Sequence, residues 1–491
     1  MISSSIEGLW LSEGAPMTIA SVPKLFEPIS PIEIALYAQL KTLLSKVERR
    51  IRVSGQQMEN EVRGGFLKWF LVEAISSSDM PIVDVEIRRV IVKDALDLEN
   101  TKVDLLLRFD SCIFSQPINL SDAVISGFEM VGGSAPEISA DRLTIRGSMR
   151  LHERYPPDPV TGPRLGKLRL CGADIRGNLD LRGCTLGFTD HVGGDDSAAE
   201  IGDYDLDESP DHAADNDSAA EIGDQDPDES PPLFADGLKV HGNVLLSGGF
   251  RSVGEIRLNG SSIDRNLDCS GASLYNPRGY SLSAAGARIK GSAYFSETPR
   301  WITYPKKSGF ISKGTLRLEG AAIEGNLTCS AGQFFATAFI SEKANPRESD
   351  IDAIFADGLR VGSDILFDQG ELFEDRFVAH GCISLINARI GGDFSCKRAI
   401  FNFPGEEPLI ADGIVVEGTT YLDDVRTDGI LRFVQANPKQ GLYINHATFD
   451  TTKSCKSWSN SKDNLARNHP VGCTHLKPRL VVRFGGKISK K

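Results

Sequence analysis

The sequence predicts an all-β protein, a parallel β-helix (solenoid) of about ten repeat motifs with a small N-terminal helical cap. Three observations support this fold class. One pattern, apolar-x-Gly-x-apolar-x-apolar, recurs along the chain after residue 85. Within each copy the apolar residues are two apart, which is the side-chain period of a β-strand. Glycine is abundant, with 48 among 491 residues, as expected for a chain that bends often.

Residues 1–80 are expected to form the helical cap. Ser30 followed by Pro31 is typical of a helix N-cap and first helical turn, and an apolar stripe runs through residues 32–47. A second helix is predicted over residues 59–74. These helices would cover the first coil of a solenoid, because terminal repeats need a cover. A membrane-surface anchor is the alternative function of the second helix.

Residues 81–450 are expected to form the solenoid itself. Its motif has two versions, ADGLKVHGNVLL at 235–246 and LRLEGAAIEGNLTC at 316–329. The versions alternate from residue 140 onward, and a degenerate copy of the second begins at Val85. Each copy should occupy its own coil, because a repeat of this length buries its apolar face only against its neighbours. Arg265 and Ser363 replace the central glycine in two copies, where we expect a less regular bend.

One position of the motif alternates between small and large side chains. In copies of the second version it holds these residues: Leu181, Cys269, Cys329 and Cys396. In copies of the first version it holds these residues: Leu246, Phe295, Phe367 and Leu422. Stacked coils need such alternation to fill a core without voids. We therefore interpret the column as a structural core ladder. A metal-binding row of thiols is the alternative, although no histidine shares the column.

Two further segments lack the solenoid pattern. Residues 190–230 include 16 acidic residues and no Lys or Arg, and the stretch DSAAEIGD occurs there twice. Such a composition cannot bury enough apolar surface to offset its ordering entropy, so residues 190–232 are expected to form a disordered acidic insert. Residues 451–491 contain ten basic residues and one acidic residue, and we expect a basic, disordered tail.

Cysteine usage and hydropathy bear on the location of the protein. The nine cysteines are odd in number, no two form a Cys-x-x-Cys pair, and no signal peptide opens the chain, which favours a reducing compartment. The longest apolar run near a helix, Phe66–Ile75, is too short to span a bilayer. We therefore expect a cytoplasmic protein, at most peripheral to the inner membrane.

No recognisable enzyme motif accompanies the repeats. The sequence has no glycine-rich phosphate loop, no nucleophile elbow and no HExxH motif, so it assigns no catalytic, cofactor-binding or metal-binding residue. Arg169, Arg257 and Arg317 hold the same place in successive copies of the second version. An aligned row of arginines would suit acidic partners or lipid headgroups as a docking strip. A solvated face balanced by neighbouring Asp and Glu is the alternative.

The repeats LRLCGADIRGNLDL at 168–181, LRLEGAAIEGNLTC and ADGLKVHGNVLL, with the preceding GGFLKWFLVEAI at 64–75, resemble an uncharacterised bacterial β-solenoid family. That family is akin in style to pentapeptide-repeat proteins and is often labelled membrane-associated oxidoreductase. The resemblance covers roughly residues 61–450. It implies a solenoid near a membrane and, through the label, redox chemistry with a flavin or nicotinamide cofactor. It transfers no catalytic residue to this chain.

The preferred function is a non-enzymatic scaffold, a rod without a cofactor that presents a surface to a protein partner or an anionic membrane. One alternative is the membrane-associated oxidoreductase that the resemblance implies. A DNA mimic of the pentapeptide-repeat kind is the other alternative. Mimicry needs a dense acidic stripe, and outside the acidic insert and the basic tail the chain is only mildly negative. Nucleic acid is not an expected partner.

Overall fold

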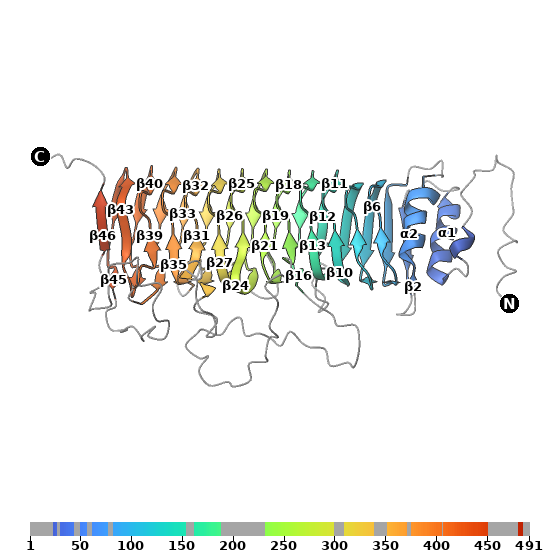
Figure 1. The fold of residues 1–491 in the computed structure, drawn as a ribbon, viewed down its shortest axis with the longest axis horizontal. Helices are drawn as coiled ribbons and strands as arrows, with labels where there is room; N and C mark the ends of the chain where they lie inside the picture. The colour runs from blue at the N-terminus through green and yellow to red at the C-terminus, as the bar shows by residue number, and fades with distance from the viewer. Residues whose placement is uncertain are drawn as a thin grey trace, which may run out of the picture.

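The protein is a row of stacked coils with helices at one end (Figure 1). The computed structural model describes residues 23–26, 30–43, 50–55, 61–76, 82–153, 162–187, 231–298, 309–337, 351–370, 375–404, 406–449 and 480–484. Strands dominate these residues, and neighbouring strands pair in parallel through one continuous sheet system. The parallel β-solenoid predicted from the repeats is confirmed.

Each coil places short strands in columns that run along the stack, and the first two columns form sheet A. The first column contains these strands: β11 (Thr144–Ile145), β14 (Asp174–Ile175), β18 (Lys239–Val240), β22 (Ser262–Ile263), β25 (Arg288–Ile289), β28 (Ala322–Ile323), β32 (Arg360–Val361), β36 (Arg389–Ile390) and β40 (Val415–Val416). The second contains these: β1 (Arg50–Ser54), β3 (Asp84–Arg88), β12 (Met149–His152), β15 (Leu179–Asp180), β19 (Val244–Leu245), β23 (Leu267–Asp268), β26 (Ala293–Tyr294), β29 (Leu327–Thr328), β33 (Ile365–Leu366), β37 (Phe394–Ser395), β41 (Thr419–Tyr421) and β44 (Gly441–Tyr443). Two longer strands span both columns: β6 (Lys102–Asp110) and β9 (Val124–Val131).

The third and fourth columns form sheet B. The third contains these strands: β2 (Glu61–Val62), β4 (Ile91–Val92), β7 (Ile113–Phe114), β16 (Thr185–Leu186), β20 (Arg251–Val253), β30 (Gln333–Phe335), β34 (Val378–His380), β38 (Ile400–Asn402), β42 (Arg426–Thr427) and β45 (Thr448–Phe449). The fourth contains these: β5 (Leu96–Asp97), β8 (Ile118–Asn119), β17 (Leu233–Phe234), β21 (Ile256–Arg257), β31 (Asp352–Phe355), β35 (Cys382–Ser384), β39 (Leu409–Ile410) and β46 (Leu480–Phe484). Four strands span both: β10 (Ser134–Ser139), β13 (Arg164–Arg169), β24 (Ser273–Ser283) and β27 (Ile311–Arg317). Strand β43 (Leu431–Pro438) starts in the fourth column and continues into the first column of the next coil.

The repeated motif accounts for one half of each coil. A copy covers the end of a fourth-column strand, a turn, and the first-column and second-column strands, as β27, β28 and β29 illustrate. Successive copies lie on successive coils, because Leu282 is in register with both Ile256 and Leu316. The prediction that a degenerate copy of the motif begins at Val85 is wrong. Val85 lies in the second column, in register with Leu107, whereas true copies of that version begin in the fourth column.

Most corners between the first and second columns hold a glycine that approaches the preceding coil closely, whereas Arg265 and Ser363 occupy this corner in two coils. A Cβ on Gly242 would lie 2.6 Å from the carbonyl oxygen of Gly177 on the preceding coil. The residue after this corner then bonds to the next coil, because its side-chain oxygen accepts a hydrogen bond from the backbone N–H of its successor. The successive members of this ladder are Ser148, Asn178, Asn243, Asn266, Ser292, Asn326, Asp364, Asp393 and Thr419.

The core is a column of apolar side chains behind the second-column strands. Cys269, Phe295, Cys329, Phe367 and Cys396 follow one another on successive coils, and all five are fully buried. The thiols are free. Burial raises the pKa of each of these three cysteines well above its ordinary value, which keeps the thiols protonated. The column therefore packs small against large side chains along the axis.

Helices cover the N-terminal end of the stack (Figure 1). Helix α1 (Pro31–Leu43) begins as predicted, since the Ser30 hydroxyl accepts from the Glu33 N–H and Glu33 accepts from the Ser30 N–H. The second helix is shorter than predicted: α2 (Gly64–Trp69) continues as a π-helical turn, Phe70–Ala74. It packs against β5, and Phe66 and Phe70 are fully buried. Among the described residues, no helix has the length and apolar character needed to cross a membrane.

Two expected domain boundaries differ from the structure. The solenoid starts at residue 50 rather than 81, because Arg50 is in register with Asp84 and Glu61 with Ile91. The basic tail is not wholly without regular structure, since its apolar run Leu480–Phe484 forms β46 and pairs with β43. Residues 190–230 of the acidic insert and most of the tail lie outside the described residues.

From β14 to β41, variation in coil length is confined to one part of the coil. Segments 154–161, 188–230, 299–308, 338–350 and 371–374 all follow the second column of a coil and precede its fourth column. The turn from the fourth column to the next coil and the corner between the first and second columns keep a constant length from β14 to β41. The recurring motif is thus the constant half of the coil.

Candidate functional site

The three arginines predicted as a docking strip lie in the fourth column of sheet B. Arg169 and Arg257 are both in register with Phe234, and Ser283 separates Arg257 from Arg317 in the same way. The three arginines therefore line up along one face of sheet B on alternate coils. Each side chain is about one-third exposed.

Every arginine of this strip has a carboxylate partner. Arg169 Nη2 lies 2.7 Å from Asp141 Oδ2, Arg257 pairs with Asp236, and Arg317 pairs with Glu319. The local charge is consequently balanced, as expected for a solvated face. Because the carboxylates hold the guanidinium groups in place, the arginines are ordered before any partner arrives.

Aromatic rings fix the same guanidinium groups from another direction. The Cζ atoms of Arg169 and Arg257 lie 5.4 and 4.7 Å from the centre of the Phe234 ring, and that of Arg317 lies 5.1 Å from the Tyr280 ring. Contacts of this kind stabilise a cation over a ring face. Within the described part of the chain, Nη1 of each arginine has no hydrogen-bond partner. Each arginine thus keeps donors available for a carboxylate.

Glu255 gives the strip a group that titrates near neutrality. Burial raises the pKa of Glu255 to about 7, while Arg257 and Arg317 act in the opposite direction. The carboxyl group is therefore mostly neutral below pH 7 and becomes charged above it. Its ionisation adds a negative charge beside two arginines of the strip.

A second charged surface, which the sequence analysis did not find, lies on sheet A. One outward position of the second column alternates in charge over successive coils, through these residues: Arg52, Glu86, Arg108, Glu129, Arg150 and Asp180. Neighbours pair closely, with Arg52 Nε 2.9 Å from Glu86 Oε2 and Arg108 Nε 3.0 Å from Glu129 Oε2. Opposite charges on facing positions stabilise a sheet, whereas like charges destabilise it.

An open cleft of about 330 Å³ lies beside this ladder. Its lining is Glu86, Arg88, Arg108, Phe109, Asp110, Glu129, Val131 and His152. The hydrogen bond from His152 lowers the pKa of Glu129, and the same bond raises the pKa of His152. The Nε2 of His152 lies 3.4 Å from Glu129 Oε1. The cleft groups thus neutralise one another in pairs.

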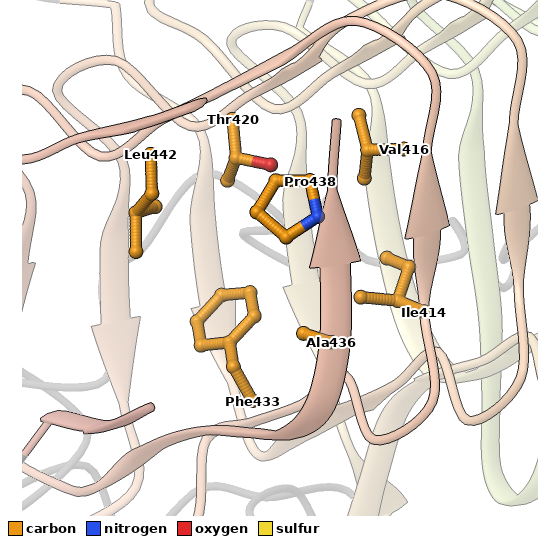
Figure 2. A pocket seen from close by; sticks show the side chains of 7 residues that line it. All are labelled: Ile414, Val416, Thr420, Phe433, Ala436, Pro438 and Leu442. Carbon is orange, nitrogen blue, oxygen red and sulfur yellow. The ribbon is translucent and has the colours of Figure 1, made fainter. Parts of the chain in front are cut away.

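A small cavity lies in the core of the C-terminal coils. Figure 2 shows its lining side chains directed toward a common space: Ile414, Val416, Thr420, Phe433, Ala436, Pro438 and Leu442. The cavity measures about 10 Å³, which is at the lower limit for a single water. It is a packing gap, too small for a substrate or cofactor.

The described ranges contain no group of three or more His, Cys, Asp and Glu side chains arranged to hold an ion. The chain matches no family model, no curated protein and no solved structure. The resemblance to the bacterial β-solenoid family therefore stays a prediction from the repeats.

Proposed function

We propose that the protein is a non-enzymatic scaffold that docks an acidic protein partner on sheet B. The arginine strip, meaning Arg169, Arg257 and Arg317 with the rings of Phe234 and Tyr280, is the proposed contact. Arginine and aromatic side chains are enriched where protein interfaces gain most of their affinity. The observation that carries the proposal is the double fixation of each guanidinium by a ring and a carboxylate.

Fixation matters because ordering long side chains opposes association. An immobilised rotamer-rich side chain costs roughly 0.5–1.5 kcal/mol on binding, and a pre-ordered arginine avoids much of that cost. Nη1 of each arginine can then meet a partner carboxylate by charge-assisted hydrogen bonds. Since Glu255 is neutral below pH 7, an acidic partner should bind more tightly at pH 6 than at pH 8.

Photo-crosslinking in the native cell tests the proposal. Phe355 follows Arg317 in the same column and can be replaced by a photoreactive phenylalanine, with Tyr294 on sheet A as the matched control position. We expect a protein adduct from position 355 and none of the same mass from position 294. The triple change Arg169→Gln, Arg257→Gln and Arg317→Gln should abolish the adduct while leaving the circular dichroism spectrum unchanged.

Other outcomes would contradict the proposal. Equal adducts from both positions, or an adduct that survives the triple change, would remove sheet B as the docking face. Binding to phosphatidylglycerol vesicles in place of a protein would favour a membrane surface. A stoichiometric flavin in the purified, coloured protein would favour the oxidoreductase that the resemblance implies.

A further inference from the structure

One pair of neighbouring positions breaks the charge pattern of the sheets. Arg360 on β32 and Arg389 on β36 are in register on adjacent coils of the first column, and both are exposed. Adjacent parallel strands lie about 4.8 Å apart, so the two side chains leave the sheet side by side. Like charges on facing positions destabilise a sheet.

Every other register pair of two charged residues in the described strands joins opposite charges. These pairs are Arg50 with Asp84, Arg52 with Glu86, Glu86 with Arg108, Arg88 with Asp110, Arg108 with Glu129, Glu129 with Arg150, Arg150 with Asp180, Glu137 with Lys167, and Asp174 with Lys239. Register pairs within the described strands therefore avoid like charges elsewhere, whereas corners do not: Asp364 and Asp393 hold equivalent corner positions on adjacent coils. The pair Arg360 and Arg389 is not explained by the needs of the sheet.

The surroundings leave both guanidinium groups uncovered. In the part of the chain that the structure describes, neither side chain has an ion pair, a hydrogen bond or a ring contact. The same column places Ala322 before them and Val415 after them. The next outward positions on the two strands are Gly362 and Gly391. No bulky side chain at these positions shields the pair.

The pair belongs to a longer line of exposed cations. In register along the first column come Lys239, Ser262, Arg288, Ala322, Arg360 and Arg389. We call Lys239, Arg288, Arg360 and Arg389 the cationic row. All four are exposed, and none has an ion pair among the described residues. The row runs along the solenoid axis.

We propose that the cationic row binds an acidic segment of a protein partner, with Arg360 and Arg389 as its main contacts. This inference rests on the scaffold function and adds a contact on sheet A to the one proposed on sheet B. Two adjacent guanidinium groups suit carboxylates, which accept paired hydrogen bonds from arginine. Carboxylates bound there would also remove the repulsion between the two arginines.

The neighbouring charges favour a narrow polypeptide over a membrane or a nucleic acid. From the coil of Lys239 onward, the other outward position of the first column holds these residues in order: His241, Asp264, Lys290, Glu324, Gly362, Gly391 and Glu417. Lys290 neutralises Asp264 and Lys439 neutralises Glu417, while Glu324 is exposed. A bilayer surface or a phosphate backbone would bring negative charge against these carboxylates. An extended peptide can follow the row alone.

Binding of a labelled oligo-glutamate peptide to the full chain, followed by fluorescence anisotropy at low ionic strength, tests the proposal. The double variant Arg360→Ser, Arg389→Ser should bind at least about tenfold more weakly, since a hydrogen bond to a charged group contributes roughly 1.5–3 kcal/mol. The control is Arg146→Ser, Arg176→Ser, which removes the same charge from two ion-paired arginines of the same column. It should change binding less than twofold.

Thermal stability gives a second readout. Arg389→Ser should raise the melting temperature at low salt, because it removes the like-charged pair, and the peptide should stabilise the wild type but not the double variant. Equal weakening by both double variants, or unchanged binding by the first, would overturn the proposal. So would phosphatidylglycerol vesicles or single-stranded DNA binding through the same two arginines as tightly as the peptide.

These outcomes are separable from those of the proposed function. The Arg360 and Arg389 variant should leave the adduct at position 355 unchanged, because that position lies on sheet B. Suppose that the adduct at position 355 persists but that oligo-glutamate binds the wild type and the Arg360 and Arg389 variant equally. The scaffold function then stands and this inference fails. If the row binds the peptide but position 355 yields no partner, sheet B is excluded instead.

Discussion

Asp352 is a single residue whose titration contributes to the pH dependence of stability in this protein. It lies in the fourth column, in register with Cys382, and is partly buried. Burial raises the pKa of Asp352 to about 7, although a hydrogen bond with the Cys382 side chain acts the other way. The folded protein therefore keeps a proton there that the unfolded chain loses near its ordinary value of 3.8.

The sign of the effect on stability follows from proton linkage. Between about pH 4 and pH 7 the folded state holds more protons than the unfolded state, so rising pH lowers the free energy of unfolding. Asp352→Asn removes this penalty and should raise the melting temperature by about 2–4 °C at pH 8, with no gain at pH 4. Differential scanning calorimetry across this range measures the difference.

Asp122→Asn is the matched control for that measurement. Arg142 lowers the pKa of Asp122, so this carboxylate stabilises the folded state at neutral pH. Its removal should lower the melting temperature at pH 8, or leave it unchanged. Parallel pH profiles for Asp352→Asn and the wild type would show that Asp352 does not titrate as described.

At the scale of the element, the corner ladder joins each coil to the next. Asn243 accepts the backbone N–H of Asn266 while its own N–H donates to Asn178. Asn243→Ala would leave the N–H of Asn266 without an acceptor, which costs about 1–3 kcal/mol. We expect this loss in the free energy of unfolding from urea denaturation.

Asn243→Asp offers the conservative comparison. Asp364 and Asp393 already accept the same bond at equivalent corners of later coils. The Asp variant should therefore retain most of the stability that the Ala variant loses. If the two variants lower the free energy of unfolding equally, the ladder hydrogen bond is not the reason why hydrogen-bonding side chains recur along this column.

The strands that recur at a constant spacing could be predicted from the sequence, and the strands outside the recurring half of the coil could not. The turn, first-column and second-column strands recur with constant spacing, so copies such as 235–246 are visible in the sequence. Third-column strands such as β34 have three residues and adjoin segments of variable length, so no period marks them. Strands β1 and β46 belong to terminal coils without a full motif copy.

The candidate surfaces were also predictable only in part: the alignment of residues at one motif position follows from the sequence, whereas contacts between coils do not. The alignment of Arg169, Arg257 and Arg317 followed from the motif because all three occupy one motif position. Their partners Asp141 and Asp236 lie on other coils, so the ion pairs could not be assigned without the register. The pairing of Arg360 with Arg389 joins the two versions of the motif and appears only when the coils are stacked.

For the whole molecule, the repeat architecture predicts local rather than global failure. Phe70 is fully buried in the helical cap, and its replacement by alanine costs about 3–5 kcal/mol. In a solenoid each coil contacts only its neighbours, so the loss of stability should affect only the helical cap and the coils next to it. Hydrogen exchange in Phe70→Ala should rise in residues 50–110 and stay at the wild-type level in residues 360–430.

Phe401→Ala at the other end is the reciprocal control. Phe401 is also fully buried, in β38 of a C-terminal coil. Its replacement should raise exchange in the C-terminal coils and spare the helical cap. Uniform loss of protection along the chain in either variant would show that the stack unfolds as one cooperative unit.

From β14 to β41, coils differ in length only between the second and fourth columns. The solenoid should therefore tolerate inserted peptides in that stretch. A peptide grafted at position 405, between β38 and β39, enters where natural coils already differ in length. The same graft at the three-residue corner His241–Asn243 would separate Asn243 from Asn178 and interrupt the stack. Grafts at equivalent sites of successive coils would stand at intervals of about 4.8 Å along one side. The spacing between inserted peptides would thus be set by the distance between neighbouring strands of the backbone.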